Sequence, residues 1–97
     1  MKTYRGDRTI DGVHVTVDGE KLRNRTDIRE LSKDGFEWSY EGPAPAQLAL
    51  SLLADHFGAA APALQHYDRF MREVVANFAN DWEMTSADVD AALAVTA

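Results

Sequence analysis

The fold is decided by residues 41–58, with the sequence EGPAPAQLALSLLADHFG, where the pattern of the chain changes. Pro43 and Pro45 exclude a central β-strand, and Pro45 suits a first helical position. We predict a helix over Gln47–Phe57. Gly58 follows it, and glycine readily adopts the left-handed conformation that ends a helix.

Three polar residues are spaced four apart along this helix: Gln47, Ser51 and Asp55. They form one narrow stripe on a surface that otherwise consists mostly of Ala, Leu and Phe side chains. A helix that is apolar over most of its circumference is normally buried on several sides. We therefore expect it to be the central helix, lying on a sheet.

The residues before this helix show the two-residue alternation of β-strands. Tyr4–Thr9 is a candidate strand, and the alternating valines of Val13–Val17 predict a second strand with one buried face. The Asp18-Gly19 dipeptide favours a tight hairpin, because both residues accept a positive φ angle. Glu20–Arg23 is then the returning strand.

A further strand is predicted where aromatic and polar residues alternate, after a polar connection over residues 24–33. Its rings belong to Phe36, Trp38 and Tyr40. Aromatic residues are common in strands, and on an exposed sheet they can stack nucleic-acid bases. Because the leucine-rich helix needs an apolar surface to pack on, we assign these rings to the core.

The residues after the central helix predict two more helices. The first opens at Ala59–Pro62 and continues to about Ala79, with apolar residues at helical spacing. Thr85-Ser86-Ala87-Asp88 resembles a capping box with Asp in place of Glu or Gln. It predicts a last helix that ends near Val95.

This order of elements predicts an α+β fold. A small antiparallel sheet of three to four strands, from the N-terminal half, packs on two to three helices from the C-terminal half. A chain of this size forms one core, so we expect a single domain over residues 1–97. Trp82 and Met84, between the last two helices, are expected to fold back as apolar plugs.

The composition excludes several kinds of site. The chain has no cysteine, and therefore no disulfide, thiolate metal site or cysteine nucleophile. The first residues lack the apolar stretch of a signal peptide, and the longest apolar run, Ala46–Ala54, is too short to cross a membrane. We expect a cytoplasmic protein that does not bind a membrane, a metal or a cofactor.

Acidic residues outnumber basic ones, and the formal net charge is −6. Residues 1–42 hold eight Lys/Arg and nine Asp/Glu, whereas residues 43–97 hold two Arg and seven Asp/Glu. Such a chain repels phosphate backbones on average, which argues against general nucleic-acid binding.

The same composition suggests a halophilic source, because Asp exceeds Glu and Arg exceeds Lys in an acidic chain. This hypothesis predicts a melting temperature that rises steeply between low and molar potassium chloride. A flat response to salt would contradict it.

Several segments carry a resemblance to a known family. They are Tyr4-Arg5-Gly6, Gly35–Tyr40, Pro45–Leu53 with its Pro-Ala-Gln-Leu-Ala-Leu helix motif, Tyr67, Phe70, Glu73-Val74-Val75 and Trp82. Together they resemble an uncharacterised family, a domain of unknown function, of short haloarchaeal, bacterial and phage proteins. The resemblance covers nearly the whole chain and implies a fold without an activity. Ala44 and Met71 depart from it, since members tend to have glycine and lysine there.

The histidines are the candidates for acid–base chemistry. His14 is expected on the exposed face of its strand. Asp55-His56 ends one helix and His66-Tyr67-Asp68 opens the next, so these groups can meet across the short loop and orient a general base. None of the spacings matches a metal motif. The alternative interpretation is a helix-end histidine that interacts with the C-terminal dipole.

The most basic stretch contains the speculative contact residues for nucleic acid or a partner: Lys21, Arg23, Arg25 and Arg29. The first three alternate, so on an extended strand they share one face, and such a row of cations can bind phosphates. Three acids are interleaved with them: Glu20, Asp27 and Glu30. The simpler interpretation is a solvated strand whose charges discourage edge pairing.

The last third of the chain carries four acids: Asp81, Glu83, Asp88 and Asp90. They can imitate phosphates towards a nucleic-acid-binding protein, or they form a solvated helix face.

Our leading hypothesis for the function is a small non-enzymatic accessory or interaction domain, with an unidentified protein partner or self-association. The alternative is a nucleic-acid-associated factor that uses the basic strand. A small enzyme with His56 or His66 as base is third.

Overall fold

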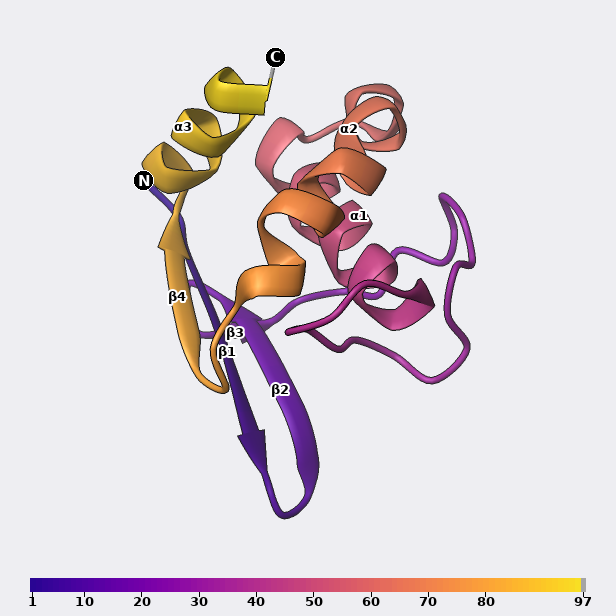
Figure 1. The fold of residues 1–97 in the computed structure, drawn as a ribbon, viewed down its shortest axis with the longest axis vertical. Helices are drawn as coiled ribbons and strands as arrows, with labels where there is room; N and C mark the ends of the chain where they lie inside the picture. Colours follow the sequence, from indigo (N-terminus) through magenta and orange to yellow (C-terminus); the bar gives the residue numbers. More distant parts are fainter. Residues whose placement is uncertain (97) are drawn as a thin grey trace.

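The computed structural model describes residues 1–96. Its strands are β1 (Thr3–Thr9), β2 (Gly12–Val17), β3 (Glu20–Lys21) and β4 (Trp82–Thr85). Its helices are α1 (Pro43–Phe57), α2 (Ala60–Glu73), the 3-10 helix η1 (Val75–Asn77) and α3 (Ser86–Thr96). The strands form one antiparallel sheet in the order β3-β2-β1-β4. Figure 1 shows the hairpin of β1 and β2 extending away from the helices. The predicted α+β fold is confirmed.

The two hairpins of the sheet follow from local sequence. β1 and β2 pair in register from Tyr4 opposite Val17 to Thr9 opposite Gly12. Asp18 and Gly19, with φ angles of 51° and 86°, make the predicted turn into β3. β3 is shorter than the predicted strand, since it ends at Lys21, and Arg25 adopts a φ angle of 53° just before a turn at residues 26–28.

The sheet has one buried and one exposed face. Residues on the buried face alternate along the strands and include Tyr4, Gly6, Val15 and Trp82. The opposite face is polar and exposed, with Arg5, Asp7, His14 and Glu83. The exposure of His14 confirms its predicted orientation.

The strand predicted over residues 36–40 is wrong. The main-chain N–H of Trp38 donates to the Glu37 carboxylate at 3.1 Å, and that of Ser39 donates to the Val75 carbonyl at 3.1 Å. Ser39 also has a φ angle of 78°, which a strand does not allow. These N–H groups are therefore not available to a neighbouring strand. Phe36 and Trp38 are buried in the core as predicted, but Tyr40 is 49% exposed.

The fourth strand is instead β4, at residues that we expected to be apolar plugs. β4 pairs with β1 in antiparallel register, with Trp82 opposite Gly6 and Met84 opposite Tyr4. Both side chains do pack inward, as plugs would. The sheet therefore joins the two ends of the chain, and one of its strands comes from the C-terminal half.

The central position of α1 is confirmed. Its residues from Pro45 to Ala54 are buried, whereas Phe57 at its end is 38% exposed, and it starts at Pro43, earlier than predicted. Gly58 ends it with a φ angle of 67° and an N–H that donates to the Ala54 carbonyl at 2.9 Å. Gln47 and Ser51, from the polar stripe, are completely buried as well.

Gln47 organises the irregular segment between β3 and α1. Its side-chain amide binds four main-chain groups at 2.6 to 3.2 Å: the N–H groups of Leu31 and Ser32 and the carbonyls of Asn24 and Arg29. The Ser51 hydroxyl donates to the Asn24 carbonyl too, at 2.8 Å. A segment without regular secondary structure needs such partners, because unpaired buried main-chain groups are destabilising.

The last helices differ from prediction only in their limits. α2 ends at Glu73 rather than near Ala79, and η1 follows it. The capping box is confirmed: Thr85 N–H donates to Asp88 Oδ2 at 2.9 Å, and Asp88 N–H donates to Thr85 Oγ1 at 3.2 Å. Val89 of α3 is buried.

Candidate functional site

Three of the four basic candidates line one hollow. Its volume is about 220 Å³, and it lies between the chain around β3 and the side of α1. Leu22 is buried, so the neighbouring Lys21 and Arg23 are directed outward and are exposed. The hollow is lined by Val17, Glu20, Lys21, Leu22, Arg23, Arg25, Ser51 and Asp55.

The hollow is not a simple cationic site, because two of its charged side chains, Arg25 and Asp55, already bind other residues of the chain. Arg25 forms a bidentate ion pair with Asp27, with hydrogen bonds of 3.1 and 3.2 Å. The guanidinium holds the pKa of Asp27 below its usual range. Asp55 accepts hydrogen bonds from Lys2 Nζ at 3.1 Å and from the Tyr4 hydroxyl at 2.8 Å. Burial and this bond to Asp55 raise the pKa of Tyr4.

Arg29, the fourth basic candidate, lies apart from the other three. Its Nη1 is 3.5 Å from the hydroxyl of Tyr67 on α2. Lys21 and Arg23 form no ion pair within the described residues. Of the row of cations expected from sequence, two side chains are therefore left without an ion pair.

His56 and His66 do not meet Asp55 and Asp68 across the loop as expected. His56 Nε2 is 2.7 Å from Oδ1 of Asp90 on α3, so it connects the end of α1 to the last helix. His66 lies near the ring of Phe57, with centroids 6.2 Å apart, and Asp68 pairs with Arg72 at 2.6 Å. Within residues 1–96, no three His, Asp or Glu side chains are grouped so that they could hold a metal ion.

Three of the four acids of the last third have partners within the protein. Glu83 pairs with Arg5 across β4 and β1 at 2.5 Å. Asp88 caps α3, and Asp90 binds His56. These carboxylates serve the attachment of β4 and α3 to the rest of the protein.

The tip of the β1–β2 hairpin carries a feature that sequence reasoning missed. Ile10 occupies the two-residue turn with Asp11, and its side chain is fully exposed. Figure 1 shows this hairpin projecting beyond the rest of the molecule. The available signal was a β-branched apolar residue next to Asp11-Gly12, where the turn between two strands calls for polar residues.

A groove follows the free edge of β2. It consists of two adjoining hollows, of about 500 and about 510 Å³, that share the lining residues Val13, Asp34 and Phe36. Towards the hairpin tip the lining adds Gly12, Glu37, Tyr40 and Pro43. Towards β3 it adds His14 and Lys21. We call this hollow surface the β2-edge groove.

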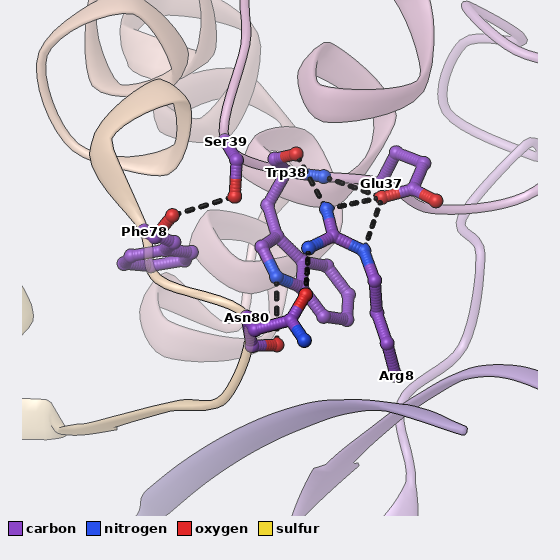
Figure 2. Close-up of polar contacts among 6 residues, drawn as sticks. All are labelled: Arg8, Glu37, Trp38, Ser39, Phe78 and Asn80. Carbon is purple, nitrogen blue, oxygen red and sulfur yellow. Dashed lines mark hydrogen bonds and ion pairs between the residues drawn. The ribbon is translucent and has the colours of Figure 1, made fainter.

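Arg8 holds the far wall of the groove in place (Figure 2). Its Nε and Nη2 donate to Glu37 Oε1 at 3.1 and 2.7 Å, and Nη2 also donates to the Trp38 carbonyl at 2.8 Å. Nη1 donates to Asn80 Oδ1 at 2.6 Å, while the guanidinium lies 4.7 Å from the Trp38 ring centroid. Because all three of its nitrogens are engaged, Arg8 fixes residues 37–38 to the sheet.

The match to a family model covers residues 4–95, from β1 into α3. The chain belongs to DUF6166, a family of unknown function. Neither the curated proteins nor the solved structures contain a match to the chain.

The structure explains two segments of the resemblance in this DUF6166 chain. In Pro45-Ala46-Gln47, the glutamine binds the irregular segment before α1. In Tyr4-Arg5-Gly6, the glycine leaves room for the indole of Trp82. Both roles are structural in this chain.

Proposed function

We propose that the chain is a small non-enzymatic interaction domain whose β1–β2 hairpin tip binds a protein partner. The observation that carries this proposal is the full exposure of Ile10 at the end of a projecting hairpin. Burying an isoleucine side chain is worth about 1.5–3 kcal/mol. A partner that covers the tip gains this free energy, while the turn itself needs no apolar side chain.

The other conspicuous polar groups support a structural rather than a chemical assignment. Arg8, His56 and Gln47 each connect two or more elements of the fold. Within residues 1–96, no helix is both long and apolar enough to cross a membrane. The hairpin, the β2-edge groove and the exposed sheet face are among the surfaces that these contacts leave open for recognition.

Affinity capture from an extract of the source organism tests the proposal. The tagged chain is compared with Ile10→Asp and with Gln65→Asp, which places the same charge on an exposed position of α2. We expect a protein that persists after nuclease treatment and is retained by wild type and Gln65→Asp. Ile10→Asp should lose it at an unchanged melting temperature.

Sedimentation velocity of the three proteins tests self-association through the same tip. A dimer that Ile10→Asp dissociates identifies a second copy as the partner. If the chain is strictly monomeric and all three variants capture the same material or none, the proposal is wrong. Partners that disappear on nuclease treatment would support the nucleic-acid alternative instead.

A further inference from the structure

We infer that the β2-edge groove binds an extended peptide in which aliphatic and basic residues alternate, and that this peptide adds a strand to the free edge of β2. The inference rests on the proposed function, because it specifies the chemistry of the protein partner. It adds a second contact surface next to Ile10, along the side of the same hairpin.

The main chain of β2 offers hydrogen-bonding groups along this edge. β3 pairs only with Thr16 and Val17, and the last bond on this side runs from Leu22 N–H to the Val15 carbonyl at 3.0 Å. Successive residues of a strand direct their main-chain groups to opposite sides. Val13, two residues before Val15, therefore directs its N–H and carbonyl into the groove, where residues 34–36 do not bond to them.

The side chains along the groove favour an alternating pattern in the bound strand. One side of it would contact the apolar groups of the groove: Val13, Phe36, Tyr40 and Pro43. Tyr40 remains half-exposed in the free protein, so a peptide can cover it further. The other side of the added strand would face solvent and the rim, where polar residues are required.

The charges at the rim specify a basic peptide. The hollow near the hairpin tip is lined by no Lys or Arg, and of its two acids Glu37 is paired with Arg8, so that Asp34 carries the unpaired negative charge. Asp34 is exposed, and its carboxylate has no hydrogen bond or ion pair within the described residues. Lys21 and His14 line the other end, so the basic residues should lie towards Tyr40. Such charge complementarity selects partners and orientation more than it adds affinity.

Two labelled heptapeptides test the inference by fluorescence anisotropy. Ser-Lys-Val-Lys-Val-Lys-Ser has the proposed chemistry, and Ser-Glu-Val-Glu-Val-Glu-Ser has the same apolar residues with the opposite charge. We expect the basic peptide to bind more tightly. Asp34→Lys should weaken it about fivefold, and Glu30→Lys, the same charge change at an exposed position outside the groove, less than about twofold.

Amide exchange and chemical shifts locate the bound peptide. The Val13 amide should shift and become protected from hydrogen exchange when the basic peptide binds. Val13→Pro, which removes that N–H at a strand edge, should abolish binding. If this variant does not fold, protection of the wild-type Val13 amide decides the question.

Equal affinity of the two peptides, equal effects of the two lysine substitutions, or shifts confined to other surfaces would overturn the inference. The outcome is separable from that of the proposed function. If the peptides fail while capture still depends on Ile10, the interaction domain stands without the groove. If the basic peptide binds at Val13 but no partner depends on Ile10, the hairpin-tip proposal fails instead.

Discussion

A Cβ atom on Gly6 would lie 2.3 Å from Nε1 of Trp82. The two residues are opposite each other in β1 and β4, and the indole occupies the space that a side chain at position 6 would need. The same ring stacks on Phe78, with centroids 4.3 Å apart, and meets the edge of Trp38 at 5.8 Å. Gly6 is therefore required for close packing between strands, and not for an unusual φ angle.

Gly6→Ala should lower the free energy of unfolding by about 1–3 kcal/mol, the usual effect of overpacking a core. Urea denaturation followed by tryptophan fluorescence or circular dichroism measures the change. In a Trp82→Phe background the penalty should shrink, because phenylalanine lacks the indole Nε1 that lies closest. An equal penalty in both backgrounds would show that Trp82 is not its cause.

Gln47→Leu should destabilise the protein by about 3 kcal/mol or more. The leucine would leave two main-chain N–H groups and two carbonyls of residues 24–32 without the partner that Gln47 provides. Each buried, unsatisfied group is worth about 1–3 kcal/mol. Gln65→Leu on the exposed side of α2 is the matched control and should stay within about 0.5 kcal/mol. Similar losses at both positions would refute this role for Gln47.

Stability should fall as the pH rises above about 10, the ordinary pKa of tyrosine. Burial and the hydrogen bond to Asp55 raise the pKa of Tyr4, so the folded protein keeps this proton at a pH where the unfolded chain loses it. Whenever the folded state binds more protons, the free energy of unfolding decreases with increasing pH. Tyr4→Phe should flatten this alkaline decline.

Tyr40→Phe is the control for Tyr4→Phe, because Tyr40 is half-exposed. Denaturation curves recorded between neutral pH and about pH 11 compare the two variants, and only Tyr4→Phe should change the slope. At neutral pH, Tyr4→Phe should also lower stability by about 1 kcal/mol through loss of its hydrogen bond. A slope that neither variant changes would assign the decline to other groups.

Nucleic acid should not bind measurably at about 50 mM salt, where electrostatic attraction to phosphates is strong. Glu20 and Asp55 line the same hollow as the cations, and Arg25 is paired with Asp27. Gel shifts with single- and double-stranded DNA and RNA check this expectation. Salt-sensitive binding that the double variant Arg23→Ala with Arg25→Ala removes, and Arg69→Ala with Arg72→Ala retains, would support the nucleic-acid alternative.

The prediction over residues 36–40 failed for a reason that lies outside that segment. The alternation of Phe36, Trp38 and Tyr40 is typical of a strand, but Glu37, Arg8 and the Val75 carbonyl supply other partners for its main chain. The strand that pairs with β1 on the side opposite β2 is β4, and its four residues are too few to show a clear strand pattern in the sequence. Which segment completes a sheet depends on competition between distant parts of the chain.

The candidate site was less predictable than the fold. Lys21, Arg23 and Arg25 were found from their spacing, and the structure does place them around one hollow. The pairing of Arg25 with Asp27, the separation of Arg29 and the free edge of β2 depend on where the chain turns after β3. A positive φ angle at Arg25 sets that turn, and no glycine marks it in the sequence.

The sequence by itself determined the elements whose causes are local. Alternating valines make β2, Asp18-Gly19 makes a tight turn, Gly58 ends α1, and Thr85 with Asp88 caps α3. Only the tertiary structure decided that Gln47 would be buried, that Trp82 would lie against Gly6 and that the edge of β2 would stay open. Turns and caps are satisfied by neighbours along the chain, whereas buried polar groups and sheet edges take partners from segments that only folding brings together.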